Sequence, residues 1–199
     1  MHITHGDIGW IEVVCGPMFS GKSEELIRRV RRAHIARQPL QVFKPKIDDR
    51  YHATKIASHS SLTFEAELAS TSAEIAQKVR ESTRVVGIDE VQFFDAGVIE
   101  LCERLANNGV RVIVAGLDQD YMGKPFGPMP QLLSIAEYVP KELAICTRCG
   151  APAGRSQRLI GGSDQVAVGA AESYEARCRK CHVPRIEATT GELFSSEKK

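Results

Sequence analysis

The stretch best suited to chemistry is a glycine-flanked turn near the start of the chain. Its sequence, GPMFSGKS, fits the pattern G-x-x-x-x-G-K-[ST] at every fixed position, after an apolar run and before a segment with helical spacing. Such a turn aims backbone N–H groups and a helix N-terminus at phosphate oxygens. A chance glycine turn is the alternative, which both flanks disfavour. The pattern therefore predicts a loop that binds a nucleoside triphosphate. It comprises Gly16, Pro17, Met18, Phe19, Ser20, Gly21, Lys22 and Ser23.

Two residues of this loop have individual roles in the pattern. Lys22 is expected to reach the outer phosphates, and Ser23 is expected to ligate Mg²⁺. A second magnesium ligand is predicted at Asp89, which follows the apolar run Val85–Ile88 as the acid of a Walker B strand does. The sequence therefore predicts a magnesium nucleotide as the ligand.

Glu90 follows directly and is the candidate catalytic residue. Neighbouring strand residues point to opposite faces, so the carboxylates of Asp89 and Glu90 share a site only where the strand breaks. The following Gln92, counted among the nucleotide-binding residues, and the phenylalanines after it favour such a break. Glu90 could then take a proton from water or from a substrate hydroxyl as a γ-phosphoryl group is transferred. The alternative is a surface glutamate after an ordinary strand.

Four of the six cysteines form two close pairs, Cys146 with Cys149 and Cys178 with Cys181. Two such pairs predict a closed tetrahedral zinc site of four thiolates, although one C-x-x-C alone could be redox active. Because four cysteines fill the tetrahedron, the adjacent His182 is left out of the ligand set. The 28 residues between the pairs exceed the roughly 15–20 of a common zinc ribbon and indicate a loop laid over a ligand.

The apolar pattern predicts the scaffold behind these residues. Four β-branched runs alternate with segments of helical spacing, which favours a parallel sheet covered by helices. The runs are Trp10–Cys15, Leu40–Phe43, Val85–Ile88 and Val110–Leu117. One helix is expected from about Gly21 to Arg37. A second is expected to begin with Asp95 as its N-cap and to stop at Gly109.

Each predicted helix has one apolar face, which should pack on the sheet. These faces contain Leu26, Ile27, Val30 and Ala33 in the first helix, and Val98, Leu101, Cys102 and Leu105 in the second. Cys102 and Cys15 are therefore expected in the core. The arginines of the first helix mostly lie off its apolar face, where a solvated surface is favoured over a nucleic-acid patch. They are Arg28, Arg29 and Arg32.

Composition bounds the architecture. The 199 residues are 43% hydrophobic and 26% charged, enough for one globular domain with a small appendage. The amino-acid composition becomes polar and glycine-rich after about Leu143. The predicted fold is therefore an α/β, RecA-like P-loop core at residues 1–143 with a parallel sheet flanked by helices. A zinc-ribbon-like domain at 144–192 carries the long loop, and a flexible tail spans 193–199.

Charge and apolar content also restrict the partners. The 26 basic and 25 acidic residues give a net charge of +1, which provides no electrostatic footprint for nucleic acid. No apolar stretch approaches the roughly 20 residues of a membrane span, and the N-terminus has no export signal pattern. We therefore expect a cytoplasmic protein that binds neither membrane nor nucleic acid.

With these elements in this order, the chain resembles the type II thymidine kinases, P-loop kinases with an appended zinc domain. The resemblance covers about Gly9 to Arg185 and rests on the order and spacing of five stretches. They are GPMFSGKS, DDRY at Asp48–Tyr51, DEVQFF at Asp89–Phe94, LDQDYMGKPFGPMP at Leu117–Pro130, and the paired cysteines with GAAESYEARCRKC.

The resemblance implies transfer of the γ-phosphoryl group of ATP to the 5′-hydroxyl of thymidine, with Glu90 as general base. It places Arg50 near the phosphates and Tyr174 at the deoxyribose. Thymine would be contacted by pocket side chains and by the main chain of the loop between the cysteine pairs, where Ala170 replaces a more usual glycine. These residues are Met18, Leu117, Tyr121, Ala167, Val168 and Gly169. A homotetramer and inhibition by thymidine triphosphate are further implications.

Two other functions compete with this one. A P-loop ATPase with a nucleic-acid-binding zinc ribbon would use Glu90 to activate water, although the zinc loop has one aromatic residue and no basic stripe. In a non-catalytic nucleotide sensor, Glu90 would be incidental. The role of Glu90 therefore discriminates between the three functions.

Overall fold

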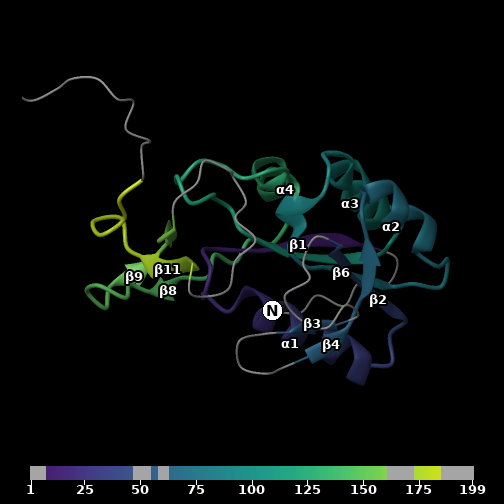
Figure 1. Cartoon of the computed structure of the whole chain (residues 1–199). Helices are drawn as coiled ribbons and strands as arrows, with labels where there is room; N and C mark the ends of the chain where they lie inside the picture. Colours follow the sequence, from purple (N-terminus) through teal and green to yellow (C-terminus); the bar gives the residue numbers. More distant parts are fainter. Residues whose placement is uncertain (1–7, 47–54, 58–62, 161–172, 185–199) are drawn as a thin grey trace, which may run out of the picture.

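The computed structural model describes residues 8–46, 55–57, 63–160 and 173–184 (Figure 1). Its centre is a five-stranded sheet with the order β1-β7-β6-β2-β5, in which all neighbouring strands are parallel. These strands are β1 (Trp10–Cys15), β2 (Leu40–Pro45), β5 (Glu67–Ala69), β6 (Val85–Ile88) and β7 (Arg111–Gly116). The predicted α/β fold is confirmed.

Helices cover both faces of this sheet, with α1 on one face and the other three on the opposite face (Figure 1). They are α1 (Lys22–Ile35), α2 (Ser72–Lys78), α3 (Gly97–Asn107) and α4 (Met129–Ile135), with a 3-10 turn, η1 (Val91–Phe93), after β6. Strand residues alternate between the two cores: Val14 packs with the α1 side, whereas Val13 packs with the other. Both faces are apolar because parallel strands are buried on both sides.

The predicted helix faces are confirmed, and one predicted cap is wrong. Each residue expected to face the sheet is buried in α1 or α3, and Cys15 and Cys102 lie in the core. The N-cap of α3 is Ala96 rather than Asp95. The Asp95 carboxylate does accept the Gly97 N–H, but it also accepts the N–H and hydroxyl of Ser72, so it joins α3 to α2. Gly109, at φ 80°, ends the turn after α3.

A segment from the second half of the chain runs along the free edge of β1. The backbone N–H of Val13 donates to the carbonyl of Tyr138, and the N–H of Glu142 donates to the carbonyl of Cys15, both at 2.8 Å. These bonds run in the parallel sense of the sheet. Residues 137–142 therefore cover the edge of the strand that leads into the phosphate loop.

The remaining strands form short antiparallel pairs. Beyond the edge segment, β8 pairs with β9 and β10 with β11, and a separate pair, β3 with β4, lies nearer the α1 side (Figure 1). They are β3 (Lys55–Ala57), β4 (Thr63–Glu65), β8 (Ala144–Ile145), β9 (Pro152–Ala153), β10 (Arg155–Arg158) and β11 (Tyr174–Arg177). Among the described residues, no helix has the length and apolar character needed to cross a membrane.

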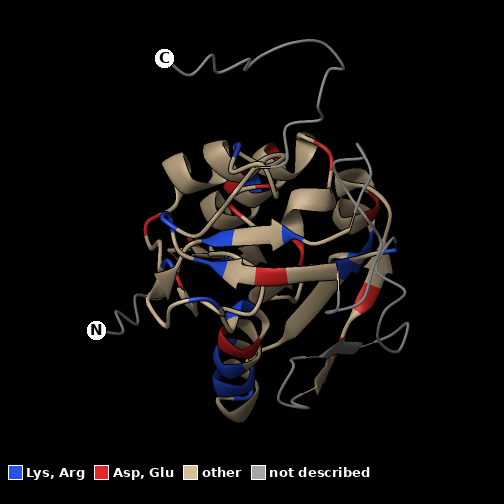
Figure 2. Cartoon of the chain, turned by 60° about the vertical axis from the view of Figure 1, so that its left-hand side comes forward, with Lys and Arg blue, Asp and Glu red and all other residues tan. Residues whose placement is uncertain are grey.

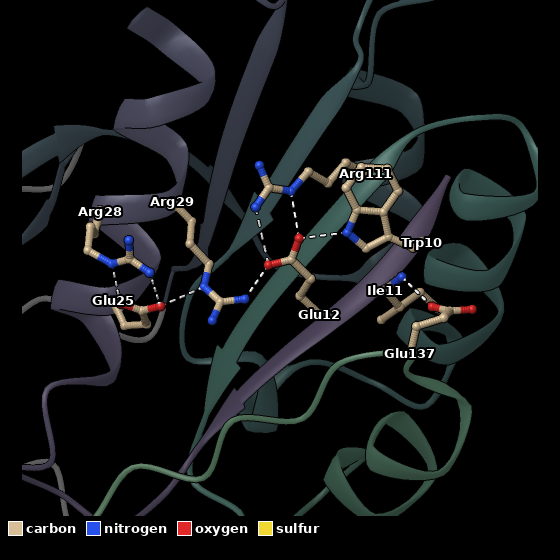
Figure 3. A network of polar contacts seen from close by, with 8 residues as sticks. All are labelled: Trp10, Ile11, Glu12, Glu25, Arg28, Arg29, Arg111 and Glu137. Carbon is tan, nitrogen blue, oxygen red and sulfur yellow. Dashed lines mark hydrogen bonds and ion pairs between the residues drawn. The ribbon is translucent and has the colours of Figure 1, made fainter. Parts of the chain in front are cut away.

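A charged network ties α1 to the sheet (Figure 3). Glu12 of β1 is 4% exposed and forms ion pairs with Arg29 of α1 and with Arg111 of β7, whose Nε lies 2.6 Å from Glu12 Oε1. The indole N–H of Trp10 donates to the same oxygen at 2.7 Å. Figure 2 shows the run of basic positions along α1, of which Arg28 is exposed as predicted. Arg29 instead turns inward because Glu12 is there to receive it.

Replacing Glu12 by glutamine is expected to lower the free energy of unfolding by about 3 kcal/mol at pH 7, because two partly buried guanidinium groups lose their counter-charge. Burial opposes ionisation of Glu12, but Arg111, Trp10 and Arg29 outweigh it and hold its pKa below the usual 4.5. The stabilisation by ionised Glu12 is therefore complete above pH 4.5, and it is lost as the pH falls through the lower pKa that Glu12 has in the folded state. Urea unfolding at pH 7 and below pH 4 measures it; a pH-independent difference would contradict this account.

Candidate active site

The phosphate loop joins the end of β1 to the start of α1 through two strained glycine positions. Gly16 has φ 146°, and a Cβ there would lie 2.2 Å from the carbonyl oxygen of Glu142 in the edge segment. Gly21, at φ 84°, is the N-cap of α1. The glycines of the pattern are therefore required by backbone conformation and by the close approach of the edge segment.

Lys22 is buried within its own loop. Its Nζ donates a hydrogen bond to the carbonyl oxygen of Pro17 at 2.6 Å. Burial lowers the pKa of Lys22, and the carboxylates of Glu90 and Asp89 counteract that shift. The ammonium group thus lies among loop atoms, where the oxygens of a bound phosphate could replace the Pro17 carbonyl.

The acidic pair lies beside this loop, at the carboxyl end of β6. The strand ends at Ile88, Asp89 is buried, and Glu90 has φ 50°, the left-handed conformation that breaks the strand. The Ser23 hydroxyl lies 3.2 Å from Asp89 Oδ2. Burial and the neighbouring charge of Glu90 raise the pKa of Asp89 to about 7. Ser23 and Asp89 therefore offer a hydroxyl and an electron-rich carboxylate that fit Mg²⁺, whose charge would favour ionised Asp89.

The four paired cysteines converge on one point. Their Sγ atoms all lie within 4.8 Å of one another, and Cys149 Sγ is 3.6 Å from the Sγ atoms of both Cys178 and Cys181. Four thiolates around zinc at about 2.3 Å have S–S separations of about 3.8 Å, so the cluster fits the ion. His182 Nε2 lies instead 2.9 Å from the carbonyl oxygen of Tyr121, consistent with its exclusion from the ligand set.

Strand β10 docks the cysteine module onto the nucleotide-binding core. The Ser156 hydroxyl accepts the backbone N–H of Met18 in the phosphate loop at 3.0 Å. The Arg158 guanidinium carbon lies 5.0 Å from the centre of the Tyr121 ring. Arg155 donates to the carbonyl oxygen of Gly123 at 3.3 Å. These three contacts were not predicted from the sequence, where the only signal was a short run of polar residues.

The structure brings together part of the predicted acceptor site. Tyr174 of β11 is the register partner of Arg158, whose guanidinium lies over the Tyr121 ring. Ser156, two residues before Arg158 in β10, accepts the Met18 N–H. Leu117 follows β7 and donates its N–H to the side chain of Gln92. Four other predicted residues lie outside the described part of the chain, namely Arg50, Ala167, Val168 and Gly169.

Asp118, which sequence analysis did not identify, is buried next to Leu117, just after the end of β7. Its Oδ2 lies 2.6 Å from Lys141 Nζ of the edge segment, whereas Oδ1 has no hydrogen-bond partner among the described residues. The Asp118 charge also reaches Cys15, whose pKa is raised to about 11 by burial and by that carboxylate. The ion pair therefore joins the chain after β7 to the edge segment.

Replacing Lys141 by methionine is expected to cost about 1–2 kcal/mol of unfolding free energy, because Asp118 is left buried and unpaired. The figure is reduced because the Lys141 side chain is half exposed and water can partly replace it. The double variant with Asp118→Asn should recover most of the loss. Urea unfolding of both single variants and the double variant measures this; simple additivity would contradict the ion-pair account.

A phosphate loop after β1 and an acidic pair after β6 define a P-loop α/β protein, and a four-cysteine module docks beside them. The family model for thymidine kinase matches residues 9–182. The chain belongs to the thymidine kinase family, and it is accordingly an ATP-dependent kinase.

A relative that aligns with most of this chain agrees with this assignment. A thymidine kinase from Rhodothermus sp. (strain ITI 518) is 54% identical over 191 residues, which cover 94% of this chain and 88% of that protein. Solved structures match more distantly. Domain III of the replication initiation protein DnaA from Thermotoga maritima has a TM-score of 0.39 and 14% identity, covering 66% of this chain and 54% of that one. The Pif1 helicase from Candida albicans has a TM-score of 0.40 and 13% identity, covering 68% and 36%.

Proposed function

We propose that this kinase transfers the γ-phosphoryl group of ATP to the 5′-hydroxyl of thymidine, with Glu90 as the general base. Family membership supports thymidine as the acceptor. The observation that carries the chemistry is the break at the end of β6, which places Asp89 and Glu90 side by side next to Ser23 and Lys22. A carboxylate in that position can accept the proton that the hydroxyl loses as it attacks phosphorus.

The phosphate loop holds and orients the donor in this proposal. Its backbone N–H groups and Lys22 bind the phosphates, while Ser23 and Asp89 hold Mg²⁺. When bound, the ion neutralises charge on the phosphate oxygens. Arg50 is proposed to reach the phosphates. Gln92, also predicted among the nucleotide-binding residues, has both ends of its side-chain amide occupied by Glu90 and Leu117. Positioning and electrostatic stabilisation therefore supply most of the rate enhancement.

The acceptor is proposed to lie between the core and the cysteine module. Met18, Leu117 and Tyr121 would line the thymine pocket, and Tyr174 would contact the deoxyribose. The main chain of the loop that contains Ala167, Val168 and Gly169 would read the base edge. Zinc held by the four cysteines has a structural role, since it anchors β10 and β11 on both sides of that loop.

Several properties follow as proposals from the family resemblance. The chain divides into a kinase core at residues 1–143, a zinc-binding domain at 144–192 and a tail at 193–199. It forms a homotetramer in the cytoplasm, and thymidine triphosphate inhibits it as the end product. Its partners are thus small molecules and copies of itself, rather than nucleic acid or membrane.

The proposal is tested by mass spectrometry of the purified protein with magnesium-ATP and an equimolar mixture of all ribo- and deoxyribonucleosides. Selective formation of thymidine monophosphate is the expected result, and the other products rank the acceptors. If only ADP and free phosphate form, Glu90 activates water and the kinase proposal is wrong. Repeating the assay with DNA then tests a nucleic-acid-stimulated ATPase.

A further inference from the structure

The side chain of Gln92 lies buried between the proposed base and the proposed acceptor pocket. It is 3% exposed, its Nε2 donates to Glu90 Oε2 at 2.5 Å, and its Oε1 accepts the Leu117 N–H at 3.1 Å. The two partners fix the orientation of the amide, because an N–H requires an acceptor and a carboxylate requires a donor. Gln92 therefore links Glu90 to Leu117 with its side-chain amide held in one orientation.

The surrounding backbone leaves room for this amide and for little else. A Cβ on Gly116 would lie 2.7 Å from Gln92 Oε1, and a Cβ on Gly127 would lie 2.4 Å from the Gln92 carbonyl oxygen. Gly127 also has φ 50°, a conformation that disfavours a side chain. Two glycines, one at the end of β7 and one in the connection to α4, thus permit the close approach that holds Gln92 in place.

Glu90 depends on this bridge for its orientation. Its backbone has φ 50°, uncommon for a residue with a side chain, and the side chain is only partly buried. In the described part of the chain, Gln92 is the one side chain that forms a hydrogen bond with the Glu90 carboxylate. Without that bond, several rotamers would compete with the orientation needed for proton transfer.

We infer that Gln92 is a positioning residue, which aims the Glu90 carboxylate and fixes its place relative to the end of β7, where Leu117 begins the acceptor pocket. This inference rests on the proposed role of Glu90 as base. Gln92 itself need not touch either substrate. Through Gln92, the folded sheet fixes the distance between the Glu90 carboxylate and the acceptor hydroxyl, so that this distance does not vary with the rotamer of Glu90.

Gln92→Met keeps the length and volume of the side chain and removes both hydrogen bonds. We expect kcat for thymidine phosphorylation to fall about 10–100-fold, because a small misplacement of a reacting group costs up to about 10² in rate. The KM for ATP should stay within about twofold. A rise in the KM for ATP with unchanged kcat would show instead that Gln92 binds the nucleotide and would overturn the inference.

Gln41→Met is the matched control. Gln41 is also a buried glutamine of the sheet region, and it accepts from Thr83 and Arg80 away from the proposed site. Its replacement should lower the melting temperature but leave kcat unchanged below that temperature. If Gln41→Met lowers kcat as much as Gln92→Met does, general destabilisation explains both results and the inference is wrong.

A double-mutant cycle with Glu90→Gln separates the inference from the function on which it rests. If Gln92 acts through Glu90, adding Gln92→Met to Glu90→Gln should lower kcat by less than about threefold further. If Gln92→Met lowers kcat by the same factor in the Glu90→Gln background as in the wild type, the positioning role is wrong. If Glu90→Gln alone retains the wild-type kcat, the proposed base is wrong; if it loses activity while Gln92→Met does not, only the positioning role is wrong.

Discussion

Glu90→Gln is expected to lower kcat by about 10²–10⁴-fold, the range that a general base contributes. The substitution keeps the shape of the side chain and removes its ability to accept the proton of the 5′-hydroxyl. ATP binding should change little, because the phosphate loop and the proposed magnesium ligands, Ser23 and Asp89, are intact. Steady-state kinetics in thymidine, with calorimetry of ATP binding, measures both effects.

An acidic residue outside the site provides the control for this substitution. Glu103 is exposed on α3, so Glu103→Gln removes one negative charge without touching the phosphate loop or the acidic pair. Its kcat should equal that of the wild type. If Glu90→Gln also retained its rate, or changed only the KM for ATP, Glu90 would not be the base and the nucleotide-sensor function would gain support.

Replacing Cys149, one of the four proposed zinc ligands, by serine is expected to unfold the cysteine module and to weaken thymidine binding at least tenfold. The sulfur lies against two of the other three thiolates, and a structural zinc ion supplies about 10–16 kcal/mol of apparent folding free energy. When the module unfolds, β10 releases both Met18 and Tyr121. ATP affinity should fall by less than about threefold, since the module reaches the phosphate loop through the Met18 N–H and the Phe19 side chain, whereas Lys22 forms its hydrogen bond within the loop itself.

Zinc analysis by mass spectrometry and calorimetry with each ligand check this result. Cys102→Ala is the control, because Cys102 lies in the core away from the cluster and burial raises its pKa to about 12, which leaves it a neutral thiol. This variant should be less stable but should retain zinc and the ratio of the two affinities. Equal losses of ATP and thymidine affinity in Cys149→Ser would contradict the separation between donor and acceptor sites.

Local patterns predicted the elements that local forces determine. The strands β1 and β6, the buried faces of α1 and α3, and the convergence of the four cysteines all followed from periodicity or spacing. The break after Asp89 was also predictable, because two acids on a regular strand could not face one site. In each case the information lies within a few residues of sequence.

Contacts between distant segments could not be predicted in this way. Asp95 was expected to be the N-cap of α3, but the N-cap is Ala96. The Asp95 carboxylate is shared with Ser72, which is distant in the sequence. Arg29 was expected in solvent, yet Glu12 draws it inward. The bridging role of Gln92 depends on Leu117 and on a glycine opposite it. Such contacts arise from the topology of the sheet, which cannot be inferred from the periodicity of single segments.

The edge segment at residues 137–142 has a consequence for the order of biosynthesis. Ile11 of β1 contacts Glu137, which lies 126 residues further along the chain. A nascent polypeptide that has not reached this segment therefore presents the outer hydrogen-bonding groups of β1 to the cell, as an unpaired strand edge prone to association. The ATP-binding half of the enzyme is translated first but is completed late, and a truncation just before residue 137 should yield an aggregating fragment rather than a minimal nucleotide-binding domain.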